Sequence, residues 1–391
     1  MKKKEVNSSR VPVYRDAGFE LYDAKTTSGA FKSETNPERE PENYIYSRYR
    51  NPTVVAAENE IMDIEGSDWA LLTQSGMSAI DTALSIFQNE KVTKPWLFFS
   101  EIYGGTISYA EAILKNRRGL DIRSFNPVNE KYNCVEFEKV IKSVKPEIVY
   151  IESISNPMLI VPDAEEIIRI AKDHGAKVLV DNTFATPMLW KPLESGVDIV
   201  IHSATKYFSG HGNLTAGVLC GNKPELLRAA LEYRKYIGHM LSPDDAYRLQ
   251  TQIQSFKLRF KQQCSNAAMA AGILESSPTV NKVWYPGLVS HSTHDEAKRL
   301  FGDKGFGAMV TFDFAGKSVA EKQKKRDNFI KAVSHKIKLI PTLGDSRTIL
   351  MPVESVWGAK YPEPGMIRLS AGFEDPDELK STIEDGLKSV E

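Results

Sequence analysis

Short apolar runs of strand length alternate with helical patterns along the first half of the chain. Helical patterns occupy residues 54–66, closed by Gly66, residues 77–87, and residues 164–175, which end on Gly175. The strand-like runs are WALLT (69–73), WLFFS (96–100), LDIRSF (120–125), IVYIES (148–153), AKVLVDN (176–182) and VDIVIHS (197–203). Strands that alternate with helices predict a parallel sheet covered by helices on both faces, so we expect an α/β fold.

The two ends of the chain follow other patterns. Residues 1–45 are polar, rich in Lys, Glu, Asn and Pro, and lack a long periodic pattern, so they predict an arm that packs on another surface. Residues 250–277 predict one long helix that leads into a second domain. Strand-like runs at 307–316 and 365–375 and a helical pattern at 377–390 predict a smaller α+β unit. We therefore expect an arm (1–45), an α/β domain (46–240) and a C-terminal domain (241–391), because 391 residues exceed one small core.

Composition narrows the class of protein. The 50 basic and 51 acidic residues nearly cancel, so charge gives no reason to expect nucleic acid or an anionic membrane as a partner. No apolar run approaches the roughly 18 residues of a membrane span, and the opening MKKKEVNSSR lacks the apolar core of a secretory signal. The scattered Cys134, Cys220 and Cys264 predict buried, reduced thiols. We expect a cytoplasmic globular protein.

An acid and an amine follow two neighbouring predicted strands. Asp181 ends one apolar run, and Lys206 follows the next run, close to the hydroxyl residues Ser203 and Thr205. Ligands of open α/β sheets bind at the carboxyl ends of the strands, so both groups can face one crevice. A buried lysine can form a Schiff base, and an aspartate can hold a proton on a pyridine nitrogen, as pyridoxal phosphate requires. Each residue alone is more readily explained as a turn-capping Asp or a surface Lys; together, with the hydroxyls beside the lysine, they favour the cofactor.

A phosphate site is the second feature of this hypothesis. The turn in TQSGMSAI places Gly76 and Met77 at a helix N-terminus, where backbone amides and the helix dipole favour an anion. The hydroxyls of Ser203 and Thr205 could add hydrogen bonds, and the ring of Tyr103 could stack on a planar cofactor. Dinucleotide and P-loop glycine motifs are absent from the sequence. The spacings of the histidines (202, 211, 291 and 294) predict no metal site.

The motifs, taken in order, resemble those of a known family. They are IYSRYRNPT, TQSGMSAI, IYGGT, ESISNP, VDNTFATP, HSATKY, YPGLVSH and IRLSAGFED, and the resemblance covers roughly residues 11 to 391. They resemble the Cys/Met-metabolism pyridoxal-phosphate enzymes: cystathionine γ-synthases, cystathionine lyases, methionine γ-lyases and O-acylhomoserine sulfhydrylases. The resemblance implies a fold-type-I enzyme with a large, mostly parallel seven-stranded sheet and a smaller C-terminal domain.

The resemblance also implies roles for single residues. Lys206 would bind the cofactor aldehyde and shuttle protons, Asp181 would pair with the pyridine nitrogen, and Tyr103 would stack on the ring. Asn156 would contact the cofactor 3′ oxygen or the substrate carboxylate, which Arg368 would clamp in a bidentate manner. The phosphate would be held by Gly76, Met77, Ser203 and Thr205 of one subunit and by Tyr46 and Arg48 of its neighbour. The arm would then pack on a neighbouring subunit, in a homotetramer built as a dimer of dimers.

Departures from the family pattern bear on the reaction. Thr342, a candidate substrate-binding residue, stands where serine is usual, and the preceding Pro341 replaces a Glu common in members that handle cystathionine or cysteine. Gly105 stands where methionine γ-lyases carry Cys, and the Gly344–Asp345 pair is shared with sulfhydrylases and methionine lyases. The segment 341–366 lacks the usual H-P and M-T-H stretches, and Arg50 replaces a small residue, which we expect to alter the pocket rim.

These features lead to a functional expectation. We expect γ-replacement on an activated homoserine, of the O-acylhomoserine sulfhydrylase or cystathionine γ-synthase type. The alternative within the family is β- or γ-elimination, of the cystathionine or methionine lyase type. An alternative of a different class is a binding-only relative without turnover, against which the joint presence of Lys206, Asp181, Tyr103 and Arg368 speaks.

Overall fold

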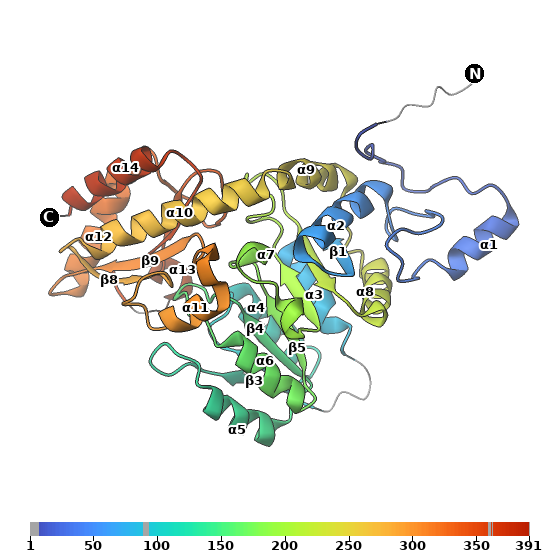
Figure 1. Ribbon diagram of the computed structural model, residues 1–391, viewed down its shortest axis with the longest axis horizontal. Coiled ribbons are helices and arrows are strands. Elements are labelled where there is room, and N and C mark those ends of the chain that lie inside the picture. Colours follow the sequence, from blue (N-terminus) through green and yellow to red (C-terminus); the bar gives the residue numbers. More distant parts are fainter. Residues whose placement is uncertain (1–7, 89–93, 359–360, 362, 391) are drawn as a thin grey trace.

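The chain folds around two β-sheets. A computed structural model describes residues 8–88, 94–358, 361 and 363–390. The predicted arm and the segment 341–366 therefore include residues outside the described ones, namely 1–7, 359–360 and 362. Figure 1 shows the large sheet and its helices on one side of the molecule and the smaller sheet on the other.

The large sheet has seven strands in the order β1-β7-β6-β5-β4-β2-β3. They are β1 (Trp69–Thr73), β2 (Trp96–Phe99), β3 (Ile122–Phe125), β4 (Ile148–Glu152), β5 (Lys177–Asp181), β6 (Ile199–His202) and β7 (Gly217–Gly221). Only β7 runs antiparallel to its neighbours, so the expectation of a large, mostly parallel sheet is confirmed. Sequence analysis found six of these strands and missed β7 (GVLCG), which is short and bounded by glycines at both ends.

Helices cover this sheet. They are α2 (Pro52–Glu65), α3 (Gly76–Ser85), α4 (Gly104–Tyr109), the π-helix η1 (Ala110–Lys115), α5 (Cys134–Val144), α6 (Ala164–Asp173), α7 (Thr186–Leu189), the short η2 (Pro192–Ser195), α8 (Pro224–Ile237) and α9 (Pro243–Ile253). The three helices predicted at 54–66, 77–87 and 164–175 are present as α2, α3 and α6. Gly66 closes α2 in the left-handed conformation, with φ of 75°, as a C-terminal cap requires. The helices α3 and α8 pack on β1, whereas α6 packs on β5.

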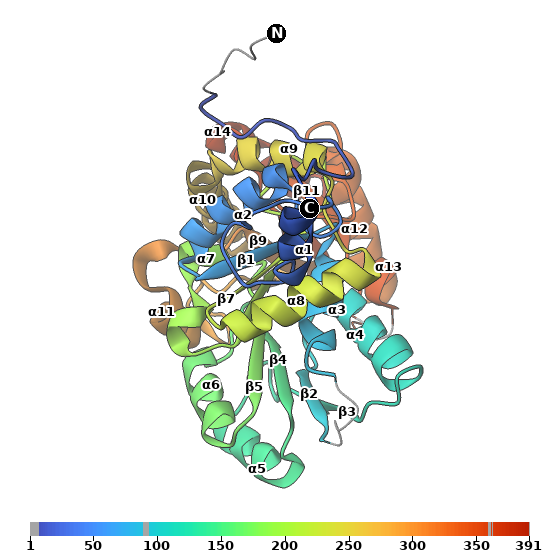
Figure 2. The ribbon, with the colours of Figure 1, turned by 90° about the vertical axis from the view of Figure 1, so that its right-hand side faces the viewer.

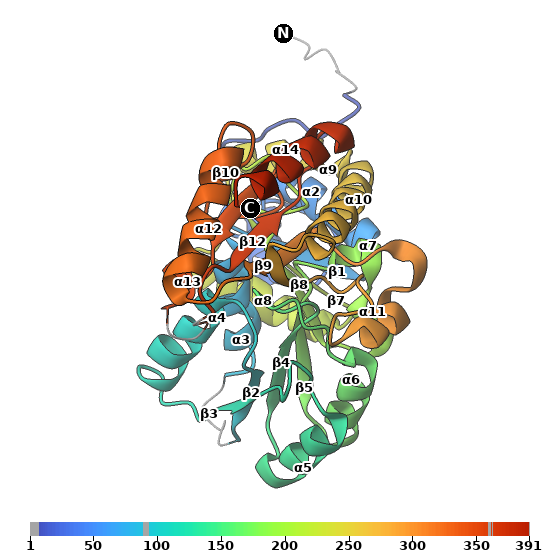
Figure 3. The ribbon, with the colours of Figure 1, turned by 90° about the vertical axis from the view of Figure 1, so that its left-hand side faces the viewer.

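The smaller sheet forms a second core in the C-terminal part of the chain. Its five strands run in the order β10-β11-β12-β9-β8. They are β8 (Val280–Trp284), β9 (Met309–Phe314), β10 (Lys338–Leu339), β11 (Ile349–Pro352) and β12 (Ile367–Ser370). The accompanying helices are α10 (Phe256–Glu275), α11 (His294–Phe301), η3 (Gly302–Lys304), α12 (Val319–Val333), α13 (Glu354–Trp357) and α14 (Pro376–Lys388). Figure 3 shows α10, α12 and α14 around this sheet.

The predicted long helix over 250–277 is wrong in one respect, because two helices occupy the segment. The chain leaves helical geometry at Ser255, where φ is −99° and ψ is 1°, and α10 begins at Phe256. The Ser255 hydroxyl donates to the Gln252 carbonyl at 3.2 Å, a local bond that competes with helix continuation. The expected bridging position of α10 is confirmed. Phe256 at the start of this helix belongs to the core of the large sheet, and Leu274 at its end belongs to the core of the small sheet.

The N-terminal arm carries a helix that sequence analysis missed, α1 (Ala24–Lys32). The arm contacts its own chain: the backbone N–H of Tyr14 donates to Thr53, Arg15 pairs with Asp244 at 2.6 Å, and Lys235 of α8 pairs with Glu34. Figures 1 and 2 show α1 and α8 on the same side of the molecule. Packing of this arm on a neighbouring subunit, and the domain boundaries near 45 and 240, stay predictions.

The three cysteines differ in burial. Cys220 and Cys264 are buried as expected, whereas Cys134 at the start of α5 is only partly buried. No helix in the described part of the chain is long and apolar enough to cross a membrane.

Candidate active site

A cavity of about 680 Å³ opens at the carboxyl ends of the parallel strands, between the two sheets. The large-sheet domain supplies its walls from the loops after β4, β5 and β6 and from the starts of α3 and α4. The smaller domain supplies Pro341, Thr342, Leu343, Met351 and Arg368. Every predicted site residue except Tyr46 and Arg48 lines this cavity; these are Gly76, Met77, Tyr103, Asn156, Asp181, Ser203, Thr205, Lys206, Thr342 and Arg368.

Lys206 lies in the loop that follows β6, four residues beyond the last residue of the strand. Its Nζ donates to Thr342 Oγ1 at 2.7 Å, so the unusual threonine contacts the candidate nucleophile directly. Burial, and secondarily the charge of Arg368, lower the pKa of the Lys206 amine from 10.5 to about 8. The backbone of Gly344 packs on the Lys206 carbonyl carbon, and a Cβ at that glycine would lie 2.9 Å from it. The amine is therefore fixed in place and easily deprotonated.

Asp181 is the last residue of β5, and its carboxylate is buried at the base of the cavity. Thr183 donates to its Oδ1 through both the backbone N–H, at 3.0 Å, and the hydroxyl, at 2.5 Å. Tyr150 adds a long contact of 3.5 Å to Oδ2. Burial raises the pKa of this carboxyl, a penalty that hydrogen bonds from Thr183 only partly offset. A cation beside the Asp181 carboxylate would stabilise its charged form, and a protonated pyridine nitrogen is such a cation.

The N-terminus of α3 forms a cradle for an anion. Ser75 caps the helix by accepting from the Ser78 N–H at 3.1 Å, which leaves the first-turn amides near Gly76 and Met77 facing the cavity wall. A Cβ at Gly76 would lie 2.9 Å from both the Cβ and the Oγ of Ser203, so the close approach of the two segments needs glycine. The Thr205 hydroxyl is engaged with the backbone of Ala216 at 3.1 Å.

Tyr103 precedes α4 and has about half of its surface exposed in the cavity mouth. Its backbone N–H donates to Glu152 Oε1 at 2.6 Å, which ties the start of α4 to the end of β4. A Cβ at Gly105 would lie 2.4 Å from the Tyr103 ring. The glycine that replaces the methionine γ-lyase Cys therefore leaves room for the ring in this position.

Arg368 of β12 faces Asn156 across the boundary between the sheets and contacts Thr342 of its own domain. Its Nη1 donates to Asn156 Oδ1 at 2.9 Å and its Nη2 to the Thr342 carbonyl at 3.1 Å. Burial lowers the pKa of the guanidinium to about 10, and the group stays charged at neutral pH. A buried, oriented guanidinium beside an amide is well suited to hold a carboxylate.

Three residues of the YSRYR segment lie away from the cavity of their own chain. Tyr46 is partly exposed, and Arg48 Nη1 donates to the Lys235 carbonyl at 2.6 Å. Arg50 is buried and absent from the cavity lining of its own chain: its guanidinium donates to the carbonyls of Glu38 and Arg39, and it lies 3.5 Å from Glu58. Arg50 therefore anchors the arm to α2. An effect of Arg50 on the pocket rim of a neighbouring subunit stays a prediction.

Sequence analysis missed several other polar residues of the cavity, among them Glu152 and Thr183. Glu152 ends β4 at the same sheet edge as Asp181, a position that the strand pattern IVYIES already marked. Thr183 follows Asp181 by two residues and accepts from the Ser203 N–H at 2.9 Å, so it links the two strand-end loops. Among the described residues, no group of three or more His, Cys, Asp or Glu is arranged to hold a metal ion.

The arrangement fits pyridoxal phosphate. A buried amine with a lowered pKa, a buried carboxylate with a raised pKa and a glycine-dependent anion cradle line one cavity. Lys206 would hold the aldehyde carbon, Asp181 the ring nitrogen, and the α3 N-terminus with Ser203 the phosphate.

Comparison with known proteins agrees with this class of site. Residues 1–388 match the family described as Cys/Met metabolism PLP-dependent enzymes. A cystathionine β-lyase of Lactococcus lactis subsp. cremoris is 34% identical over 89% of this chain and 90% of that protein. An O-succinylhomoserine sulfhydrylase of Pseudomonas aeruginosa is 33% identical over 88% of this chain and 84% of that protein. The crystal structure of cystathionine γ-synthase from Xanthomonas oryzae pv. oryzae superposes with a TM-score of 0.85, at 25% identity, over 97% and 93% of the two chains.

The chain belongs to the Cys/Met-metabolism family of pyridoxal-phosphate enzymes. It is thus a PLP-dependent lyase or transferase of sulfur amino-acid metabolism.

Proposed function

We propose that the protein catalyses γ-replacement on an O-acylhomoserine, with a sulfur nucleophile as the acceptor. The observation that carries the proposal is the charge of the cavity. Among the described residues that line it, Glu152, Asp181, Lys206 and Arg368 are the charged ones. Glu152 accepts from Tyr103, and the other three suit the cofactor and the substrate α-carboxylate, so the side-chain end of the substrate meets uncharged groups.

The uncharged part of the wall indicates the leaving group. Its apolar surface is supplied by Met77, Ile80, Ile107, Leu343 and Met351. Among the described residues of the cavity lining, a second carboxylate, such as that of a succinyl ester, would find no cation beyond the two already assigned, and burying an unpaired charge is costly. We therefore favour a neutral acyl group, such as acetyl.

Each polar residue has a defined task in this reaction. Bound pyridoxal phosphate supplies an electron sink that stabilises negative charge at the substrate Cα. Arg368 and Asn156 hold the α-carboxylate, which orients the Cα–H bond toward Lys206. The Lys206 amine then takes the proton from Cα and moves protons at Cβ, aided by its lowered pKa, while Thr342 fixes its direction. Asp181 keeps the ring nitrogen protonated.

Elimination is the second candidate, and the similarity to the Lactococcus cystathionine β-lyase favours it. Both reactions begin with removal of the Cα proton by the same amine. They differ in whether a thiol adds to the substrate skeleton or water releases a 2-oxo acid and ammonia. Pro341, where cystathionine-handling members commonly carry Glu, favours replacement over a cystathionine lyase, since the distal amino group would lack the carboxylate of that position.

We also propose that the working form is a homotetramer, a dimer of dimers in which Tyr46 and Arg48 complete the phosphate site of a neighbour. Two observations support it. Tyr46 and Arg48 are absent from the cavity lining of their own chain. The same side of the molecule also exposes large apolar side chains, among them Tyr22, Phe31 and Tyr236.

Product analysis separates the two reactions. The holoenzyme is incubated with O-acetylhomoserine, with and without sulfide, and homocysteine, 2-oxobutyrate and acetate are quantified. We expect homocysteine and acetate only when sulfide is present. A 2-oxo acid formed at the same rate without any thiol would instead establish a lyase. O-succinylhomoserine in parallel reactions tests the neutral leaving group and should give a lower kcat/KM.

A further inference from the structure

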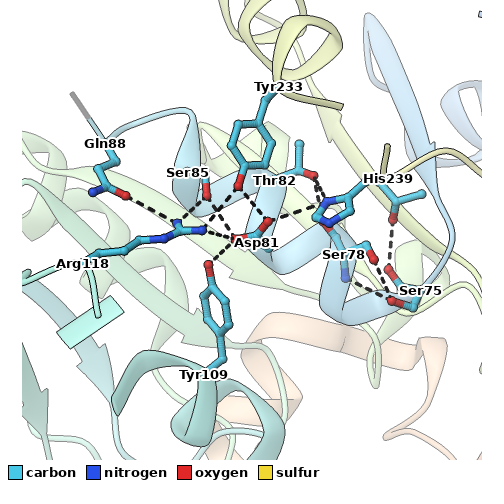
Figure 4. A network of polar contacts seen from close by, with 11 residues as sticks. Ser75, Ser78, Asp81, Thr82, Ser85, Gln88, Tyr109, Arg118, Tyr233 and His239 are labelled. Atoms are coloured by element: carbon cyan, nitrogen blue, oxygen red, sulfur yellow. Dashed lines mark hydrogen bonds and ion pairs between the residues drawn. The ribbon is translucent and has the colours of Figure 1, made fainter. Parts of the chain in front are cut away.

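A half-buried carboxylate outside the cavity joins the two helices that form its wall. Asp81 follows Ile80 on α3, and Ile80 itself lines the cavity. Tyr109, the last residue of α4, donates its hydroxyl to Asp81 Oδ1, and Tyr233 of α8 donates to Oδ2 at 2.9 Å. Arg118 adds an ion pair at 3.0 Å. Figure 4 shows Asp81 at the centre of these three side chains.

The helix α4 depends on contacts of this kind for its position. It has six residues, too few to be stable alone, and it continues directly into the π-helix η1. Its start is fixed by the bond from the Tyr103 N–H to Glu152. Its end is fixed by the bond from Tyr109 to Asp81. Since Arg118 follows η1, Asp81 Oδ1 holds the chain both before and after the irregular helix.

The carboxylate is charged in this environment. Burial alone would raise the pKa of Asp81, but hydrogen bonds from Tyr109 and Tyr233 and the charge of Arg118 together lower it. Hydrogen bonds to a charged acceptor are about twice as strong as those between neutral groups. His239 lies beside the cluster, with Nδ1 3.2 Å from Thr82 Oγ1 and 3.7 Å from Asp81 Oδ2.

We propose that Asp81 is a positioning residue: through Tyr109 it sets where α4 holds the Tyr103 ring relative to the cofactor bound at the start of α3. The two helices carry the two groups that must meet, since α3 begins with the anion cradle and α4 follows Tyr103 directly. Asp81 itself does not line the cavity. The inference depends on the cofactor and is independent of whether the enzyme replaces or eliminates.

The chain offers a matched control for this idea. Tyr109 and Tyr233 donate to the two oxygens of the same carboxylate, but Tyr109 belongs to a cavity helix and Tyr233 to α8. The variants Tyr109→Phe, Asp81→Ala and Tyr233→Phe are purified as holoenzymes. The measurements are the visible circular dichroism of the bound cofactor, the rate of cofactor loss, kcat and KM, and the thermal unfolding midpoint of the apoprotein.

We expect Tyr109→Phe and Asp81→Ala to reduce the visible circular dichroism at least twofold and to speed cofactor loss. The value of kcat should fall roughly tenfold, because small misplacements of reacting groups carry large rate effects, with little change in KM. Tyr233→Phe should lower the unfolding midpoint as much as Tyr109→Phe and keep the wild-type dichroism and kcat. Equal dichroism and kcat in the two tyrosine variants would overturn the proposal, and this comparison stands even if Asp81→Ala does not fold.

Discussion

At the scale of single residues, the site depends on moving ionisation equilibria away from their usual positions. Lys206 and Asp181 are both buried, and burial acts on them in opposite senses: it lowers the pKa of the amine and raises that of the carboxyl. Both shifts favour the neutral forms in the free protein. A cofactor that reacts with a neutral amine and brings its own cation at the ring nitrogen satisfies both groups.

The lowered pKa of the Lys206 amine predicts how the rate of cofactor capture depends on pH. Only the neutral amine of Lys206 can attack the cofactor aldehyde, so capture of pyridoxal phosphate by apoprotein should speed up as pH rises, with a midpoint at about 8. Between pH 8 and 10.5 the unfolded chain binds a proton at this lysine that the folded chain lacks, so this group makes folding more favourable as pH rises through that window. Stopped-flow absorbance across this range measures the rate, and a free model amine corrects for titration of the cofactor.

A variant of Arg368 tests what lowers the pKa of Lys206. Arg368 contributes to the lowered pKa after burial, so Arg368→Gln should move the midpoint of cofactor capture to higher pH. A midpoint near the ordinary lysine value in the wild-type protein, or an unchanged midpoint in the variant, would show that the electrostatic account of the site is wrong.

At the scale of elements, the positions of helix ends decide which groups meet. The helix α3 approaches the loop after β6 so closely that a Cβ at Gly76 would meet Ser203 at 2.9 Å. Thr183 in turn joins the loops after β5 and β6 through its hydroxyl. The cradle is therefore formed by the segments that follow three strands, β1, β5 and β6, and contacts between these segments fix their positions.

The glycine at this contact gives a prediction at the element scale. Gly76→Ala should push α3 from the loop, at about 1–3 kcal/mol of overpacking, and weaken cofactor affinity roughly tenfold or more. The control is Gly272→Ala in α10, where an added Cβ meets nothing within 4 Å. That change should stabilise the protein by about 0.5–1 kcal/mol through helix propensity. Cofactor titration and chemical unfolding check both; unchanged affinity in the Gly76 variant would contradict the cradle.

At the scale of the whole molecule, one chain brings together the reacting groups but keeps its YSR segment outside the cavity. Arg48 contacts the carbonyl of Lys235 in α8, on the side where the arm and α1 lie (Figure 2). An enzyme whose sites need a second chain would have this arrangement in each of its subunits.

Complementation between inactive chains tests the shared site. Lys206→Ala removes the nucleophile, and Arg48→Ala should weaken phosphate binding in the neighbouring site. When the two variants are co-expressed with different tags and the mixed assembly is purified, one site of each mixed pair holds both native residues. We expect activity well above that of either variant alone. Activity no higher than that of the Arg48→Ala protein would show that each site uses its own Arg48.

Some elements of the fold could be predicted from the sequence and others could not. The strands β4, β5 and β6 are continuous apolar runs, because both of their faces are buried, and such runs are recognisable without a structure. The strand β7 and the helix α1 were missed, since each has a weak local pattern and depends on its neighbours. The break at Ser255 was missed for a similar reason, because a local hydroxyl contact ended a pattern that otherwise continued.

The sequence by itself determined the class of fold, the family and polar residues that line the cavity, because these follow from hydrophobic period and from specific motifs. The tertiary structure alone decided which groups touch. It placed Thr342 on the amine of Lys206, turned Arg50 into an anchor of the arm, and linked Asp81 to Tyr109. Contacts between residues far apart in the chain depend on how helices and strands pack, and no local pattern encodes that packing.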